Sequence, residues 1–317
     1  MKALSRTRKY GFRIATPLMA TTALASLLIF GGTGTAQATP SYAYASLGFT
    51  NFQLTGIVDS HGNALPGVTI NSVAVTMTDG ANYPGYPSAG TTSFGDLATG
   101  VDAPGAYSGP GPATGPNIFT PALQMSSGTR SDGLISGALA SGATSNLVAE
   151  GRLTQGLSSA GSQAGSSTTI RATFTTTSSL TVGLLGSAIA QVMASVGQVG
   201  DSASAQIFAQ FTVFDATTNT YVNICKTSDP TDCSQFLTPT ELNISAATTD
   251  PSTSPSVTSS LTDFSYFANL TADHTYQVTL QDQVTEILST VPEPASMAVL
   301  GMGILGLAGV VRRRKHR

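Results

Sequence analysis

The sequence predicts an all-β fold, an antiparallel β-sandwich or jelly-roll-like domain over residues 39–290. Apolar residues recur at every second position in several short stretches, which is the pattern of a half-buried strand. Thr and Ser fill many of the alternate positions, and they suit strands better than long helices. Turn-forming stretches at 59–63, 197–201 and 215–219 separate the runs, and no helical pattern intervenes. The length suffices to bury the core of one large β domain.

The expected strands follow from this alternation. Over 205–213 the odd positions are Ala, Ile, Ala, Phe and Val, with Gln, Phe, Gln and Thr between them. In chain order, the expected strands are 47–58, 73–77, 147–153, 170–174, 188–196, 205–213, 221–225 and 276–280. After the last of these strands the alternation changes phase near Asp282, which indicates a β-bulge.

Two segments depart from the strand pattern. Residues 79–128 are rich in Pro and Gly and predict one long loop, which is unusual inside a compact domain. Its aromatic residues, Tyr83 and Tyr86 among them, would either stack on sugar rings or fasten the loop to the sheet. Residues 248–260 are rich in Ser, Thr and Pro and predict a second exposed loop.

The N-terminal segment 1–38 has the features of a secretory signal peptide. A basic region precedes an apolar stretch at 14–30, and Ala36 and Ala38 form a small-x-small cleavage site. We expect signal peptidase to cut after Ala38. A retained membrane helix is the alternative, and the Gly-rich run at 31–34 disfavours it.

The C-terminal segment 291–317 has three parts in a fixed order. The prolines of Pro292-Glu293-Pro294 keep the backbone extended. Residues 295–311 lack charge and would span about 25 Å as a helix, which is at the short limit for crossing a bilayer. A basic cluster follows and would stay on the cytoplasmic side of the membrane. Its members are Arg312, Arg313, Arg314, Lys315 and Arg317.

This tail resembles the PEP-CTERM sorting signal of Gram-negative bacteria in all three parts. In that family an integral-membrane cysteine peptidase, the exosortase, reads the tripeptide and passes the ectodomain to the cell surface or extracellular matrix. The resemblance implies that Pro292, Glu293 and Pro294 are the recognition element, 295–311 a disposable anchor and 312–317 a retention cluster. The ectodomain would then be periplasmic before sorting. An ordinary C-terminal anchor after a Pro-rich stalk is the alternative.

A weaker resemblance concerns the core of the chain. Residues 200–205, the strand after them and the 276–280 strand resemble a subgroup of PEP-CTERM ectodomains with a Glu-Asp-Ser-Ala motif. Gly200 stands here in place of the Glu, and the subgroup has no activity to carry over. The alternative is that Asp201 and Ser202 are turn residues that open a strand.

The exported part of the chain is strongly acidic. Of its Lys and Arg residues, the expected mature region keeps only Arg130, Arg152, Arg171 and Lys226. Against 17 acidic residues these four give a net charge of −13, with Glu293 included. Such a field repels nucleic acid and anionic lipid and favours divalent cations or basic partners. We therefore exclude nucleic-acid binding, and we consider exopolysaccharide and divalent cations as partners.

The two cysteines, Cys225 and Cys233, bracket a turn-rich segment. In an oxidising exported compartment this spacing predicts a local disulfide. Metal binding is disfavoured, because two thiolates without a nearby histidine make a poor zinc site. The pairs Asp229 with Asp232 and Asp263 with Asp273 could bind calcium, but neither has EF-hand spacing.

Little in the sequence points to catalysis. His61 and His274 lie in turns, each with an Asp nearby that could orient an imidazole. Local motifs of Ser hydrolases, zinc peptidases and phosphate-binding loops are absent from the sequence. We predict no catalytic residue, no metal site and no cofactor. The prediction is a non-enzymatic surface or matrix protein; a carbohydrate-binding module using the 79–128 loop and a secreted hydrolase with paired carboxylates are the alternatives.

Overall fold

The computed structural model describes residues 39–291, except 60, 62, 98–99, 111–112, 114, 124–126 and 155–160. The expected signal peptide, the sorting tripeptide, the apolar segment and the basic cluster therefore lie outside the described residues. Within the described part, no helix has the length and apolar character needed to cross a membrane.

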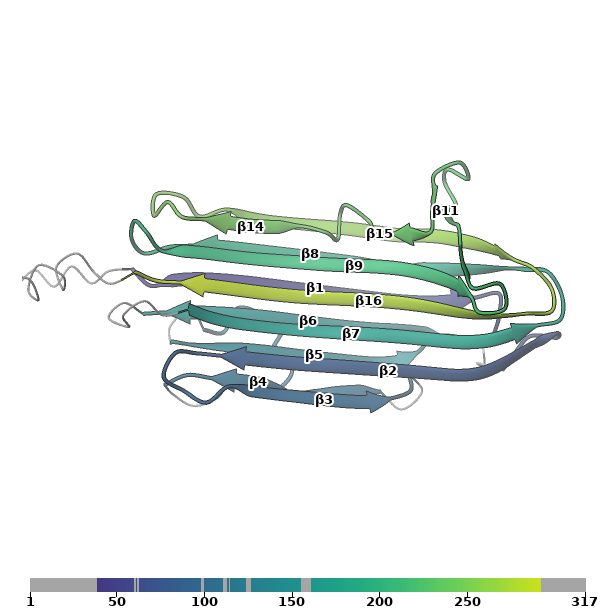
Figure 1. Cartoon of the computed structure of the whole chain (residues 1–317), viewed down its shortest axis with the longest axis horizontal. Coiled ribbons are helices and arrows are strands. Elements are labelled where there is room, and N and C mark those ends of the chain that lie inside the picture. The colour runs from purple at the N-terminus through teal and green to yellow at the C-terminus, as the bar shows by residue number, and fades with distance from the viewer. Residues whose placement is uncertain are drawn as a thin grey trace, which may run out of the picture. The chain divides into compact units, whose positions relative to one another are not determined.

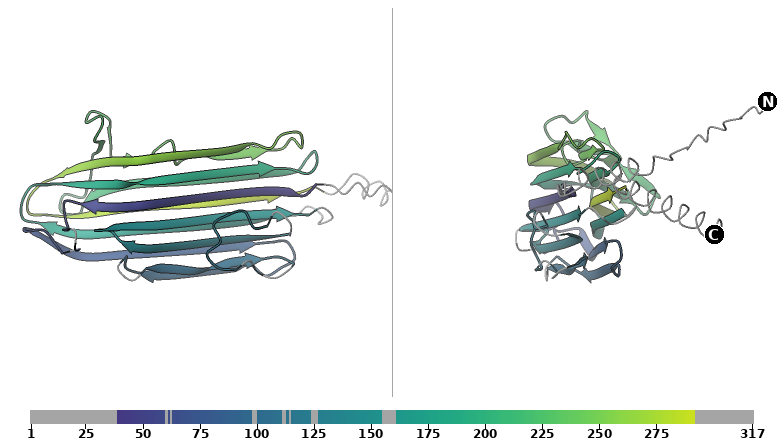
Figure 2. Two further views of the ribbon diagram at one scale, coloured as in Figure 1. Left: turned by 180° about the vertical axis from the view of Figure 1, so that it is seen from behind. Right: turned by 90° about the vertical axis from the view of Figure 1, so that its left-hand side faces the viewer.

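The described chain folds into two antiparallel sheets packed face to face (Figures 1 and 2). The first sheet contains, in spatial order, β12 (Cys233–Ser234), β11 (Ile224–Lys226), β15 (Ser256–Leu270), β8 (Leu180–Ser195), β1 (Ser41–Thr55), β6 (Gly142–Leu153), β5 (Gly128–Ala138) and β4 (Val101–Ser108). The second contains β10 (Thr220–Val222), β9 (Ser202–Asp215), β16 (His274–Ser289), β7 (Gly161–Thr176), β2 (Val68–Asn82) and β3 (Ala89–Gly95). Two short strands, β13 (Phe236–Leu237) and β14 (Ser245–Thr248), pair with β9. The predicted all-β fold with antiparallel sheets is confirmed.

Alternation of burial explains why these sequences form the sandwich. In β7, β9 and β16 every second residue is buried and the intervening ones are partly or fully exposed. One end of the core holds a cluster of Phe rings, in which Phe49, Phe211 and Phe264 lie with centroids 5.7–6.3 Å apart. Towards the start of β1, small buried residues such as Ala43 take the place of these rings. The space between the two sheets is therefore filled by large side chains at one end and by small ones at the other.

The expected β-bulge near Asp282 is wrong. β16 keeps a continuous register with β7 and with β9 from His274 or Tyr276 to Ser289. The alternation of burial also continues, so that Asp282 and Glu286 occupy core positions in phase with Leu280 and Val284. The sequence pattern broke because two core positions carry acids, and the backbone does not change phase there.

The 79–128 segment is not one long loop. It contains the end of β2 together with β3 and β4, and irregular backbone dominates only after Ser108. Its aromatic residues differ in exposure: Tyr83 is 1% exposed and lies in the core, whereas Phe94 is 77% exposed on β3. Tyr83 therefore cannot stack on a sugar ring, which removes one of the two tyrosines from the predicted carbohydrate site.

Several other segments differ in extent from the prediction. Residues 221–225 divide between β10 and β11, which belong to different sheets. The second loop is shorter than 248–260, because β15 already begins at Ser256. Conversely, β1 begins at Ser41, before the predicted 47–58 strand. These differences lie at the boundaries of strands, which sequence patterns locate least reliably.

Candidate functional site

The point where the chain leaves the sandwich is held by a buried carboxylate, Asp201. The backbone N–H of Val291 donates to Oδ1 of Asp201 at 3.0 Å, and the Ser41 hydroxyl donates to Oδ2 at 2.7 Å. Asp201 is 0% exposed. The Gln198 side-chain amide adds a bond of 2.8 Å to the carbonyl oxygen of Val291. One carboxylate thus ties the first strand to the residue that precedes the Pro-Glu-Pro segment.

This geometry gives Asp201 a role beyond opening a strand. It also explains why Gly occupies position 200, where the resembling subgroup has Glu. Gly200 has φ +97°, and a Cβ there would lie 2.8 Å from a methyl group of Val291. A Glu side chain would therefore strain the backbone and press on the residue that Asp201 holds. We call Ser41, Gln198, Asp201 and Val291 the exit clamp.

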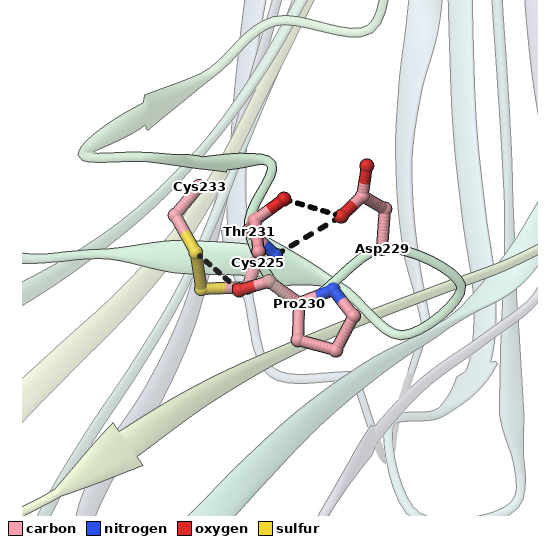
Figure 3. Close-up of a disulfide and its surroundings, with 5 residues drawn as sticks. All are labelled: Cys225, Asp229, Pro230, Thr231 and Cys233. Atoms are coloured by element: carbon pink, nitrogen blue, oxygen red, sulfur yellow. Dashed lines mark hydrogen bonds between the residues drawn. A yellow bond between two sulfur atoms is a disulfide. The ribbon is translucent and has the colours of Figure 1, made fainter.

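The predicted disulfide between Cys225 and Cys233 is present and joins β11 to β12 (Figure 3). Asp229, in the loop that it closes, accepts hydrogen bonds from the Thr231 backbone N–H at 3.1 Å and hydroxyl at 2.7 Å. These hydrogen bonds lower the pKa of Asp229. Asp232 forms an ion pair with Lys226. Both carboxylates of this candidate calcium pair are therefore engaged by protein groups.

The other candidate calcium pair is Asp263 with Asp273. Asp263 accepts a hydrogen bond from the Ser187 hydroxyl at 3.2 Å, and both residues have positive φ values that suit tight turns. Over the described residues, no three His, Cys, Asp or Glu side chains gather as a metal-binding group.

The two histidines lie in different surroundings. The Nδ1 atom of His274 lies 2.7 Å from Oδ2 of Asp215, so its carboxylate partner comes from β9 and not from the neighbouring Asp273. Burial pushes the pKa of Asp215 upward, but hydrogen bonds from His274 and from residues 217–218 outweigh it and lower the pKa. His61 lies in a turn, where its backbone N–H donates to Asp59.

A buried ion pair fixes the irregular segment that follows β4. The guanidinium of Arg130 lies 2.7 Å from a carboxylate oxygen of Glu150, and both side chains are almost fully buried. Arg130 also donates to the carbonyl oxygen of Thr120 at 2.7 Å, and Glu150 accepts from the backbone N–H of Leu123 at 2.9 Å. Because each charge satisfies backbone groups of the segment, the pair fastens it to the sheet.

Three carboxylates on the inner face of the second sheet are buried and take part in no ion pair with a described side chain: Asp79, Asp282 and Glu286. Burial raises the pKa of Asp79 to about 7 and that of Asp282 to about 8. Burial likewise raises the pKa of Glu286 well above its ordinary value. Gly151 on the facing strand makes room for Glu286, because a Cβ there would lie 2.4 Å from the carboxylate. Sequence reasoning missed this group, although the even positions of β16 place both of its acids on the core face.

The comparisons with known proteins concern the tail. The family model of the PEP-CTERM protein-sorting motif matches residues 290–315. Comparison with curated proteins and with solved structures gives no match. The matched segment begins directly after β16, and its third residue is Pro292. The motif implies exosortase-dependent sorting of an exported protein. The chain thus carries a PEP-CTERM protein-sorting motif immediately after the last strand of its sandwich.

Proposed function

We propose that this protein is a non-enzymatic component of the cell surface or extracellular matrix. Signal peptidase removes residues 1–38, and the apolar segment 295–311 holds the protein briefly in the inner membrane. An exosortase then cuts near Pro292-Glu293-Pro294 and transfers the sandwich outward. The observation that carries this proposal is the position of the motif: it starts where β16 ends, so the whole sandwich is the sorted cargo.

The burial of the acids supports a non-enzymatic role. A carboxyl group with a raised pKa is the usual candidate for a general acid. In the described part such groups are Asp79, Asp132, Asp282 and Glu286, and each is at most 3% exposed. Their burial in the folded sandwich weighs against the secreted-hydrolase alternative.

The exit clamp fits the same proposal. Hydrogen bonds to Asp201 and Gln198 hold Val291 against the sandwich, so the tripeptide comes directly after a fixed residue in the chain. An exosortase would therefore meet the tripeptide close to the folded domain. The acidic mature region would remain soluble among hydrated polysaccharide and divalent cations.

The test replaces Pro292, Glu293 and Pro294 by alanine in the native host. We expect the wild-type protein to lose its C-terminal segment and leave the membrane fraction, and the variant to keep its full mass and stay in the inner membrane. Intact-mass measurement and fractionation report both outcomes. Alanine replacement of the exposed turn 251–253 is the control and should be sorted normally. Unchanged processing of the tripeptide variant would refute the proposal.

A further inference from the structure

The outer face of the second sheet differs in charge from the rest of the domain. The acids of its five principal strands are Asp79, Asp215, Asp282 and Glu286, and all four are buried. The outward positions of β7, β9 and β16 are mostly Gln, Ser and Thr, with Arg171 as the one charged residue among them. A domain of net charge −12, without Glu293 of the tail, thus presents a broad sheet face without a carboxylate.

This face is hollowed across its strands. Two adjoining hollows of about 400 Å³ and about 340 Å³ share Gln283 and Thr285. Gly80, Gly165, Thr285 and Gln206 are successive cross-strand partners and form one row from β2 to β9. We call this hollow the amide groove. Three strand spacings of about 4.8 Å give the row a length of about 14 Å, and β3 extends it at one end.

The groove offers neutral hydrogen-bonding groups. The side-chain amides of Gln163, Gln206 and Gln283 make no hydrogen bond to another described residue. Each amide has two N–H donors and an accepting oxygen. Thr285 adds a hydroxyl, and Phe208 supplies an apolar ring at the β9 end. Convergent polar groups beside an apolar surface are the usual means of fixing a small polar ligand in a site.

We propose that the amide groove binds a neutral polysaccharide chain laid across β2, β7, β16 and β9. Sugar hydroxyls both donate and accept hydrogen bonds, which matches amides and hydroxyls better than it matches charged side chains. The negative field of the domain repels an anionic polymer but leaves a neutral one unaffected. Gly80 and Gly165 have no side chains, which deepens the groove at this point. A chain of sugar rings therefore enters between the flanking side chains.

The amide groove overlaps the 79–128 segment only near the end of β2 and the start of β3, and none of that segment's aromatic residues lines it. The proposal rests on the surface or matrix role for its biological ligand. Binding by the purified chain is nevertheless independent of sorting, so failure of either proposal can be recognised separately.

Affinity electrophoresis of the full-length chain in neutral detergent tests the proposal. The gels contain galactomannan, hydroxyethyl cellulose or dextran, with alginate as the anionic comparison. Gly80→Leu is the principal variant, because a Cβ at Gly80 meets no atom within 4 Å and its backbone is not left-handed. Its side chain fills the groove without backbone strain. Gln283→Ala is the second variant, and Gln191→Ala, on the opposite sheet, is the matched control.

We expect retardation by at least one neutral polysaccharide and none by alginate. Gly80→Leu should weaken binding tenfold or more and Gln283→Ala severalfold, while Gln191→Ala binds like the wild type. The urea midpoint of each variant verifies that the domain remains folded. Retardation by none of the three neutral polymers, retardation by alginate alone, or equal binding by Gly80→Leu would overturn the proposal.

Discussion

Replacement of Asp282 by asparagine is expected to stabilise the protein at pH 8 and to reduce the pH dependence of its stability. Asp282 is 0% exposed and lies between β7 and β9 in the core of the second sheet. Ser145 donates a long hydrogen bond of 3.5 Å to its Oδ2 atom, and Oδ1 has no partner among the described residues. An ionised carboxylate there is poorly compensated.

The sign and size of the effect follow from the pKa. Burial raises the pKa of Asp282 from 3.8 to about 8, so the folded state retains a proton that the unfolded state loses above about pH 4. The contribution of Asp282 to stability is therefore greatest below pH 4 and falls by about 1.4 kcal/mol per pH unit as the pH rises towards 8. The whole loss is on the order of 5 kcal/mol for this group. Asparagine keeps the shape of the protonated acid and carries no charge at either pH.

Urea denaturation of the full-length chain, followed by far-UV circular dichroism, measures this difference at pH 5 and pH 8. The wild type should be less stable at pH 8, and Asp282→Asn should lose most of that decline. The exposed Asp250→Asn variant is the control and should keep the wild-type decline, to which Asp79 and Glu286 also contribute in the same direction. A wild type that gains stability from pH 5 to pH 8, or a variant with an undiminished decline, would refute the reasoning.

Two further predictions concern other buried and cross-linked groups. Arg130→Ala should lower the unfolding free energy by about 3–5 kcal/mol, because Glu150 is left as an uncompensated buried charge. Urea denaturation checks this, and an Arg130→Met/Glu150→Leu double variant should recover part of the loss; a single variant as stable as the wild type would contradict it. Reduction of the disulfide in the 225–233 loop should cost at most about 2–3 kcal/mol, measured as the urea midpoint with and without reductant. A much larger loss would show that the loop supports the core.

Much of the fold could be predicted from the sequence because strand formation leaves a local signal. Alternation over 170–174, 205–213 and 276–280 located the centres of β7, β9 and β16. The ends of the strands were predicted less well. β1, for example, begins at Ser41, six residues before the predicted strand 47–58. The 79–128 segment was misjudged because Gly and Pro are common there, although β3 and β4 lie at or near the edges of their sheets and tolerate both residues.

The candidate sites could likewise be predicted where their residues are close in the sequence, and not where the residues meet only through folding. The sorting tail was recognised from contiguous residues, and the family model matches it over 290–315. The disulfide also followed from short spacing and compartment. The exit clamp could not be predicted, because Ser41, Asp201 and Val291 are far apart in the chain and meet only through strand pairing.

The sequence by itself determined the all-β class, the sorting motif and the acidity of the exported part, since each depends on composition or on neighbouring residues. The tertiary structure alone decided which strands lie beside and opposite one another, and whether the last strand keeps its phase through its two acids. The apolar residues of 276–280 mark the even face of this strand as the buried one, but the acids at 282 and 286 left open whether the strand keeps that phase. Long-range packing makes that choice, and it encloses the acids in the core while leaving the amides on an uncharged outer surface.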